Sequence, residues 1–248
     1  MSTESAANMQ FLLINLDRST DRLERSAGLL SSYDIAFHRV PAVDGRELSV
    51  ETLSKILAPD YSAYYKVLTA SEVGCYLSHK KCWQYVIDQD LDYAVILEDD
   101  FSVSQDVLKL KEYIAAITEP WDYIKLMEYP EKRKVVASFK CLDKQLVRYD
   151  KIPIRACAYV ITKQCAQKML ARYPKIARPV DVDCQYWWES GIEVFGLKPY
   201  IFSVKLQTES TIDGGGNRKN SEKSIIKQYV HKVGFMYNNY IHSKRRER

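Results

Sequence analysis

The chain has 248 residues, of which 46% are hydrophobic and 27% charged, the proportions of an ordinary globular protein rather than a disordered one. This length allows one large α/β domain or two small ones with a substantial buried core. The net charge of +4 is unevenly placed: residues 217–248 carry nine Lys and Arg against two Glu, a net of +7, so the remainder is near −3.

The cysteines and the apolar segments indicate the compartment. The six cysteines form no CxxC pair and have no His spacing typical of zinc. Most lie in apolar stretches, where a free cysteine behaves as a small hydrophobic residue, so we expect a reducing environment. Residues 1–10 are polar and residues 11–16 are too short for a signal or a span. We therefore expect a soluble, cytoplasmic protein that is at most peripheral to a membrane.

The first elements predict a parallel sheet. Residues 10–16 (QFLLINL) are typical of a buried strand, a helix pattern follows, and residues 36–43 predict a second strand that ends at Asp44-Gly45. Such a β-α-β opening indicates parallel strands. Arg22 lies one turn into the helix, where it could meet a phosphate at the carboxyl end of the first strand.

A second helix is predicted from a capping box, Thr69-Ala70-Ser71-Glu72, to about residue 88. Gly74 in its first turn would allow another backbone to approach closely. The helix also carries Ser78 and His79, a hydroxyl and an imidazole. From spacing alone, His79 is better explained as an ordinary core or surface histidine than as a functional one.

The most informative stretch is residues 93–100, a short apolar run that ends in Glu98, Asp99 and Asp100. The run predicts a strand buried on both faces of an α/β sheet. Ligands of such sheets bind at the carboxyl ends of the strands, and Mg²⁺ or Mn²⁺ prefers oxygen ligands. We favour a metal–phosphate site here, and the alternative is an acidic, solvated turn.

The second half continues the α/β pattern. It predicts a helix over 104–117, a strand over 121–126, a polar hairpin or excursion within 132–150, a strand over 155–161 followed by a helix capped by Thr162, and a strand over 200–205. Asp181 and Asp183 lie two residues apart and would share a face if extended, although an N-cap and an exposed carboxylate are the alternatives. Trp187 and Trp188 fit either a sugar-stacking surface or the core.

The basic tail predicts an amphipathic helix. From residue 221 onward, one helical face gathers Ile225, Ile226, Tyr229, Val230, Val233 and Tyr237. A basic helix of this kind suits an anionic membrane surface, but packing of its apolar face on the domain is slightly favoured. For Lys244-Arg245-Arg246, with no apolar face to bury, the membrane surface is favoured.

Taken together, these landmarks resemble glycosyltransferase family 25, which includes bacterial lipopolysaccharide galactosyltransferases and collagen-modifying enzymes. The matching segments are residues 14–19 (INLDRS) with Arg22, 39–45 (RVPAVDG), 72–79 (EVGCYLSH), 96–100 (ILEDD), 158–161 (AYVI), 179–181 (PVD), and Gln207 with 210–212 (STI). The resemblance covers a domain of residues 10–215 and leaves residues 216–248 as a separate basic helix and tail.

The resemblance implies a GT-A-like, Rossmann-related α/β fold, in which helices flank a mostly parallel central sheet. It also implies a UDP-sugar donor, most often UDP-galactose, inversion at the anomeric carbon, and a divalent cation, Mn²⁺ or Mg²⁺. Asp100 would bind the metal directly and Glu98 through water, while Asp99 would hold the ribose. The other donor contacts would be Asn15, Asp17, Arg22, Asp44, Ser78, His79 and Gln207. The general base would be Asp181, or else Asp183.

The function expected from the resemblance is transfer of a hexose to a saccharide acceptor. We expect this acceptor to be the lipopolysaccharide or lipooligosaccharide core, met at the inner face of the bacterial inner membrane. One alternative is a nucleotidyltransferase, although its usual basic, Gly-rich loop after the first strand is replaced here by Asn15-Leu16-Asp17-Arg18. A non-catalytic carbohydrate-binding module is the other alternative, and the intact acidic triplet argues against it.

Overall fold

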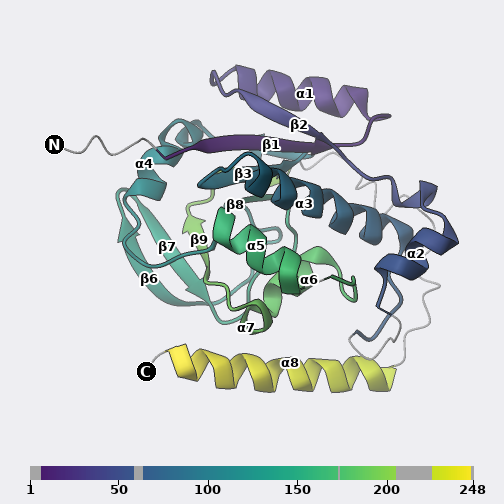
Figure 1. Ribbon diagram of the computed structural model, residues 1–248. Coiled ribbons are helices and arrows are strands. Elements are labelled where there is room, and N and C mark those ends of the chain that lie inside the picture. The colour runs from purple at the N-terminus through teal and green to yellow at the C-terminus, as the bar shows by residue number, and fades with distance from the viewer. Residues whose placement is uncertain (1–6, 59–63, 173, 205–224, 247–248) are drawn as a thin grey trace.

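The computed structural model describes residues 7–58, 64–172, 174–204 and 225–246 (Figure 1). The strands are β1 (Met9–Asn15), β2 (Phe37–Pro41), β3 (Tyr93–Glu98), β4 (Phe101–Val103), β5 (Tyr123–Lys125), β6 (Val135–Cys141), β7 (Lys144–Tyr149), β8 (Ala158–Thr162), β9 (Val194–Lys198) and β10 (Phe202–Val204). The helices are α1 (Thr20–Ser31), α2 (Val50–Ile56), α3 (Ala70–Asp88), α4 (Leu110–Ala115), α5 (Lys163–Arg172), α6 (Val180–Gln185), α7 (Trp187–Ser190) and α8 (Ile225–Arg246). Short 3-10 turns lie at Gly45–Glu47 and Gln105–Lys109.

A mixed sheet organises the molecule. Within the described residues it has eight strands in the order β2-β1-β3-β8-β5-β9-β7-β6. The pairings show that β8 and β7 run against the other six. A second small sheet pairs β10 with β4. The predicted α/β architecture with a mostly parallel central sheet is therefore confirmed.

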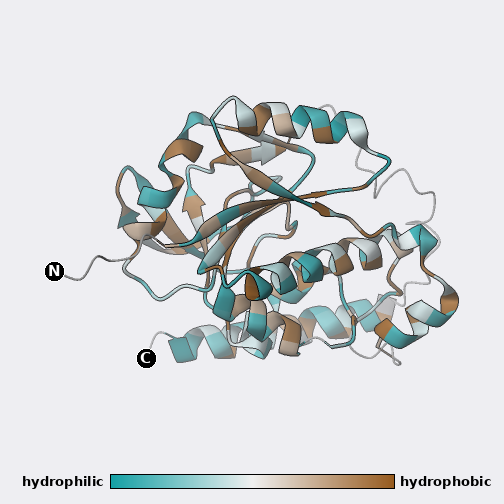
Figure 2. Ribbon diagram, turned by 45° about the horizontal axis from the view of Figure 1, so that its top comes forward, coloured by the Kyte–Doolittle hydropathy of each residue, from teal (hydrophilic) through white to brown (hydrophobic). Residues whose placement is uncertain are grey.

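The sheet separates two hydrophobic cores, and β3 contributes to both. Ala94 and Ile96 face the core beneath α3 and α5, whereas Val95 and Leu97 face the core that includes residues of α4. All four side chains are fully buried, and the central strands are among the most hydrophobic parts of the molecule (Figure 2). This alternation is the physical basis of the predicted doubly buried strand.

Two further predictions are confirmed locally. Thr69 caps α3: its Oγ1 accepts from the Glu72 backbone N–H at 3.2 Å, and Glu72 Oε2 accepts from the Thr69 N–H at 2.9 Å. Residues 132–150 form the hairpin β6–β7, which extends the main sheet through β9. The described cysteines are all free, and all but Cys75 are buried.

Other predictions need correction. The helix expected over 104–117 is a 3-10 turn followed by the short α4, and β9 and α2 were not predicted. The segment with Asp181 and Asp183 is helical rather than extended, so these side chains point in different directions. The domain boundary expected at 215/216 lies outside the described residues.

The largest correction concerns α8, which lies along the outer side of α6 and α7 (Figure 1). Its packed face is centred on Phe235, whose ring lies 5.1 Å from that of Tyr186 and 5.3 Å from that of Trp188. The predicted apolar face points the other way. Ile226, Tyr229, Val230, Val233 and Tyr237 are 47–77% exposed, so the favoured interpretation that this face packs on the domain was wrong.

The end of α8 also differs from expectation. Arg246 does not extend into solvent: its guanidinium lies over the Trp187 ring and 2.9 Å from Glu193 Oε1. Trp187 belongs to the core, Trp188 packs against it, and both contact α8, which favours the core interpretation of these residues. No helix within the described ranges has the length and apolar character needed to cross a membrane.

Candidate active site

The acidic triplet lies where β1 and β3 end side by side. Their parallel register places Ile14 opposite Glu98, which brings Asn15 next to Asp99. Asn15 Nδ2 donates to Asp99 Oδ2 at 2.7 Å. Arg22 of α1 reaches the same point, 3.0 Å from Asp99 and 3.8 Å from Asp100. Asp99 is only 7% exposed, so the turn is not the solvated one of the alternative interpretation.

Burial and mutual repulsion set the electrostatics of the triplet. Burial, and next the Glu98 carboxylate, raises the pKa of Asp100 to about 6. Burial also raises the pKa of Asp99, although Arg22 and Asn15 act against it. Burial acts upward on Glu98 too, but the hydrogen bond and attraction of His79 outweigh it and lower its pKa. Ionised together, the three carboxylates oppose folding unless a cation joins them.

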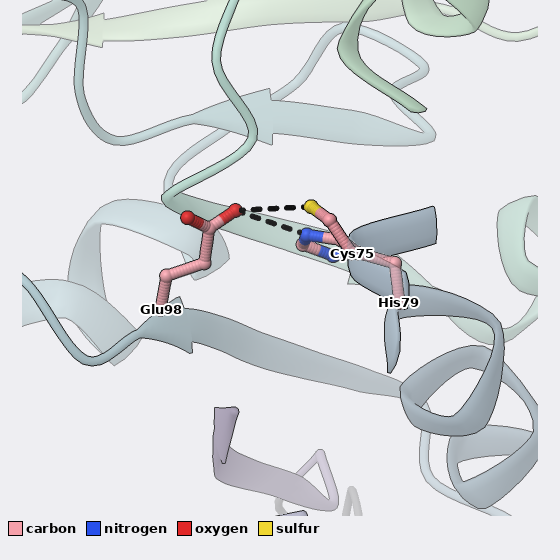
Figure 3. Close-up of side chains that lie close together, drawn as sticks. All are labelled: Cys75, His79 and Glu98. Atoms are coloured by element: carbon pink, nitrogen blue, oxygen red, sulfur yellow. Dashed lines mark hydrogen bonds and ion pairs between the residues drawn. The ribbon is translucent and has the colours of Figure 1, made fainter. Parts of the chain in front are cut away.

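His79 is a buried residue that contacts the triplet directly. Its Nε2 lies 3.1 Å from Glu98 Oε1, and its Nδ1 lies 2.9 Å from the Tyr159 hydroxyl. The Cys75 thiol donates to the same Glu98 oxygen at 3.9 Å (Figure 3). His79 is therefore both a core histidine, as spacing suggested, and the residue that orients Glu98.

Ser78 and Gly74 position the loop between β2 and α2. Ser78 Oγ accepts from the Val43 backbone N–H at 2.9 Å and donates to the Gly74 carbonyl at 2.7 Å. A Cβ on Gly74 would lie 2.5 Å from the Val43 oxygen, so α3 can approach this loop only with glycine there. The contact confirms the predicted close backbone approach, and it places Asp44 beside the end of β1.

Two cavities meet at the triplet. The smaller, of about 100 Å³, is here named the β1 cavity and is lined by Asn15, Arg18, Arg22, Asp44, Ser78, His79, Glu98 and Asp99, among others. The larger, of about 770 Å³, is named the α8 cavity and is lined by Tyr64, Tyr65, Asp100, Arg133, Lys151, Arg155, Asp181 and, from α8, Lys232 and Phe235, among others. Cys75 and Glu98 line both, so they form the boundary between the two spaces.

The structure brings most of the predicted residues together, but not all. Asp17 has a side chain 78% exposed, pairs with Arg39, and lines neither cavity. Gln207 lies outside the described residues. Asp44 lines the β1 cavity, and its hydrogen bond with Arg46 lowers its pKa to about 2.

The two candidate bases occupy different environments. Asp181 lines the α8 cavity, and its Oδ2 accepts from the Arg155 backbone N–H at 2.8 Å. Asp183 is 1% exposed and lies outside the cavity; its oxygens accept from Tyr76 Oη at 2.8 Å and Arg178 Nε at 2.5 Å. Asp181 alone of the two can therefore meet a substrate without rearrangement.

The donor set fits a hard divalent cation. Glu98, Asp100 and Cys157 offer atoms within 4.8 Å of one another. Asp100 Oδ1 is buried and has no hydrogen-bond partner among the described residues, as expected for an oxygen that binds a cation. Burial raises the pKa of the Cys157 thiol well above its ordinary value, so the carboxylates are the available ligands.

Sequence reasoning missed several lining residues. Tyr64, Tyr65 and Cys75 line the α8 cavity because of tertiary packing, which no local sequence pattern indicates. Arg155 has a positive φ of 69°, which for a non-glycine residue marks a constrained backbone. That conformation accompanies the N–H bond to Asp181, a contact between distant parts of the chain.

Comparison with known proteins places the chain. The family model described as glycosyltransferase family 25 (LPS biosynthesis protein) matches residues 8–184. The chain belongs to glycosyltransferase family 25. The matched segment contains both β1 and β3, the acidic triplet and Asp181.

The relatives of this family 25 protein include animal proteins. It is 33% identical over 186 residues to procollagen galactosyltransferase 1 of Danio rerio, covering 69% of this chain and 30% of the relative. It is 30% identical over 178 residues to procollagen galactosyltransferase 2 of Homo sapiens, covering 66% and 28%. It is 31% identical over 186 residues to the inactive glycosyltransferase 25 family member 3 of Homo sapiens, covering 70% and 30%.

The chain therefore spans about three tenths of the length of these relatives. Because one of these relatives is named as inactive, we judge catalytic activity from the residues of the candidate site. A solved Drosophila galactosyltransferase, in complex with manganese, UDP-Gal and xylobiose, overlaps 84% of this chain and 79% of its own at a TM-score of 0.40 and 10% identity.

Proposed function

We propose that this protein is a metal-dependent, inverting glycosyltransferase that moves galactose from UDP-galactose to a saccharide acceptor. The observation that carries the proposal is the meeting of two cavities at Glu98, with Asp99 on one side and Asp100 and Asp181 on the other. A two-substrate transfer needs two adjoining spaces with the leaving and attacking groups between them. The family assignment supports the same reaction class.

The β1 cavity would hold the nucleotide. Asp99, fixed by Asn15 and Arg22, would accept hydrogen bonds from the ribose hydroxyls, and Asp44 lines the same cavity. Arg22 also brings positive charge toward the phosphates. His79 and Ser78 contribute indirectly, because one orients Glu98 and the other fixes the loop that carries Asp44.

Asp100 and Glu98 would hold the cation, either Mn²⁺ or Mg²⁺. When bound, such a cation neutralises the negative charge that develops on a leaving diphosphate. The protein's part is to hold two carboxylates close together, with one buried oxygen of Asp100 that has no hydrogen-bond partner among the described residues.

Asp181 would act as the general base. One hydrogen bond, from the Arg155 N–H to Oδ2, fixes its orientation, and the side chain faces the α8 cavity. An acceptor hydroxyl there would donate its proton to Asp181 as its oxygen attacks the anomeric carbon. The bond to the UDP oxygen breaks on the opposite side, so the configuration inverts.

Steady-state assays test this proposal. Purified protein with UDP-galactose, Mn²⁺ and a panel of saccharide acceptors should release UDP and form a β-linked product from the α-linked donor, as read by NMR. A nucleotidyltransferase would instead release pyrophosphate from UTP and a sugar phosphate, and a binding module would release neither. Pyrophosphate release without UDP release would overturn the proposal.

For the acceptor, we propose the lipopolysaccharide or lipooligosaccharide core, in keeping with the family description. Relatives named procollagen galactosyltransferases make a collagen acceptor the alternative. Parallel assays with a core oligosaccharide and with a hydroxylysine-containing collagen peptide distinguish the two.

We further propose that the protein works at the inner face of the bacterial inner membrane, where α8 contacts anionic lipid. The outward stripe Ile226, Tyr229, Val230, Val233, Tyr237 and Tyr240 is 47–77% exposed. The helix from Ile225 to Arg246 contains three Lys, two Arg and no Asp or Glu, but Lys232 lines the α8 cavity and Arg246 pairs with Glu193. An apolar stripe flanked by cations on an acid-free helix matches an anionic membrane surface.

Liposome co-sedimentation tests the membrane contact. Binding should require anionic lipid, weaken with salt, and fall severalfold in Tyr229→Ser/Tyr237→Ser and in Lys227→Glu/Arg245→Glu. Val50→Ser, at an apolar side chain 84% exposed on α2, is the matched control and should bind as the wild type does. Equal binding to neutral vesicles, or concentration-dependent dimerisation through the stripe, would overturn it.

A further inference from the structure

One wall of the α8 cavity is basic, and the proposed reaction does not use it. Arg133 lies before β6, Lys151 follows β7, and Lys232 belongs to α8. All three line the same cavity as Asp100 and Asp181. The two ends of the β6–β7 hairpin and the distant helix α8 therefore bring cationic groups to one cavity.

Protein carboxylates do not neutralise this basic wall. Within the described part of the chain, none of the three side chains forms an ion pair with Asp or Glu. Two acidic residues close to the wall in sequence are engaged by backbone: Asp150 accepts from the Lys151 N–H at 2.6 Å, and Glu128 accepts from the Arg133 N–H at 2.9 Å. The carboxylates that line the same cavity, among them Asp100 and Asp181, form no ion pair with the three cations within the described residues. The positive charge is thus left facing the cavity.

The wall is also held in place and under mutual repulsion. The Lys151 ammonium lies 4.4 Å from the centre of the Phe235 ring on α8. Burial lowers the pKa of Lys151, and the positive charges of Arg133 and Lys232 lower it further. Like charges gathered without a protein partner lower stability, and an anion placed among them would relieve the repulsion.

We propose that Arg133, Lys151 and Lys232 bind an anionic substituent, a phosphate or carboxylate, on the saccharide acceptor. Arginine offers a planar fork and lysine a point charge, the usual pair of groups for such oxyanions. The cavity also presents Tyr64 and Tyr65 and is large enough for more than one sugar ring. This inference rests on the proposed function only in assigning the α8 cavity to the acceptor.

The donor diphosphate is the competing anion, and position argues against it. The guanidinium of Arg22 lies against Asp99, on the β1 side of the boundary formed by Cys75 and Glu98. The basic wall lines only the other cavity, together with α8. Because Arg22 already supplies positive charge for the donor on the β1 side, we assign the wall to the second substrate. Asp100 lines the α8 cavity too, so the UDP affinity of the double variant is the measurement that separates the two anions.

Binding measurements on the full chain test the inference without requiring transfer. The probes are mannose, mannose 6-phosphate, glucuronic acid, inorganic phosphate and UDP, titrated at low ionic strength and followed by NMR or calorimetry. The wild type should bind both anionic sugars at least tenfold more tightly than mannose. Arg133→Gln/Lys151→Gln should lose this preference and keep its affinity for UDP. Lys140→Gln, an exposed position on the same hairpin and outside the cavity, should behave as the wild type.

Three results would overturn the inference. Equal affinity of the wild type for mannose and mannose 6-phosphate would mean that the wall does not select charge. A loss of UDP affinity in the double variant would assign the wall to the donor, and phosphate binding as tight as mannose 6-phosphate would make it a bare anion site. If the preference holds while no galactosyl transfer is found, the proposed function fails and the binding site stands.

Discussion

At the scale of single residues, Asp100 combines two acidic neighbours with a buried oxygen that has no hydrogen-bond partner in the described part of the chain. Its pKa is about 6 in the folded protein against 3.8 for an unperturbed group. Between these values the folded state binds more protons than the unfolded state, so stability falls as pH rises through this interval. The free-energy cost of keeping Asp100 ionised in the folded state is fully present above about pH 6 and absent below about pH 4.

Asp100→Asn should therefore melt at a higher temperature than the wild type at pH 8 in EDTA. We expect a gain of about 1–3 kcal/mol in unfolding free energy, which shrinks as the pH is lowered toward 4. The same variant should lose transfer because it loses a cation ligand. Glu24→Gln, at an exposed position of α1, is the control. A variant that melts with or below the wild type at pH 8 would contradict this account.

The two aspartates of α6 give the second residue-scale prediction. Asp181→Asn should lower transfer by roughly 10²–10⁴-fold and leave UDP affinity unchanged, because a general base acts on the acceptor.

Asp183→Asn should keep transfer per folded molecule but lose about 2–3 kcal/mol of stability, since Arg178 loses a buried partner while Glu189 remains. Kinetics and urea unfolding on both variants check this. An inactive Asp183→Asn beside an active Asp181→Asn would exchange the roles.

At the scale of elements, sequence patterns succeeded where the signal is local. β1, β3 and α3 were predicted because continuous apolar runs and a capping box are written in consecutive residues. β9 was missed because Gly196 interrupts its pattern, and only the fold reveals why glycine is needed: a Cβ there would lie 1.8 Å from the Tyr149 hydroxyl oxygen. The helical state of residues 180–185 depends on contacts such as Tyr76–Asp183, 107 residues apart, and was not accessible.

The packing of α3 against the loop of Asp44 leads to an element-scale prediction. Gly74→Ala should destabilise the protein by about 1–3 kcal/mol, because the new Cβ must displace the backbone at Val43 and Gly45. It should also weaken UDP binding by moving Asp44. Gly28→Ala is the matched control: its Cβ meets nothing within 4 Å, so α1 should gain up to about 1 kcal/mol. Thermal unfolding and UDP titration compare the two, and equal effects would refute the close-approach argument.

At the scale of the whole molecule, the candidate site combines what sequence could and could not supply. The donor side follows from motifs at the ends of β1 and β3, which meet because parallel neighbours end at one edge. The proposed acceptor side is assembled from Tyr64, Arg155, Lys151 and α8, whose convergence is a tertiary property. An amphipathic pattern likewise predicts that α8 has an apolar face, but not that its more polar face is the one that packs.

Because α8 lines the proposed acceptor cavity, its packing on the domain should control acceptor use. Phe235→Ala removes the ring that packs between Tyr186 and Trp188, and we expect hydrogen exchange to rise along α8. Transfer should fall through a higher acceptor KM, while UDP affinity stays constant. Tyr240→Ala, with a side chain 61% exposed, should change neither. Loss of UDP affinity in Phe235→Ala would show instead that α8 supports the donor side.

The two faces of α8 have a geometrical consequence. One face borders the chamber that contains Asp181, and the opposite face carries the exposed stripe. If the stripe rests on lipid, the helix becomes a spacer whose thickness, roughly 10 Å with side chains, sets the height of the chemistry above the bilayer. A spacer of this kind would select acceptors by the distance of their sugars from the membrane, independently of which hydroxyl groups those sugars present.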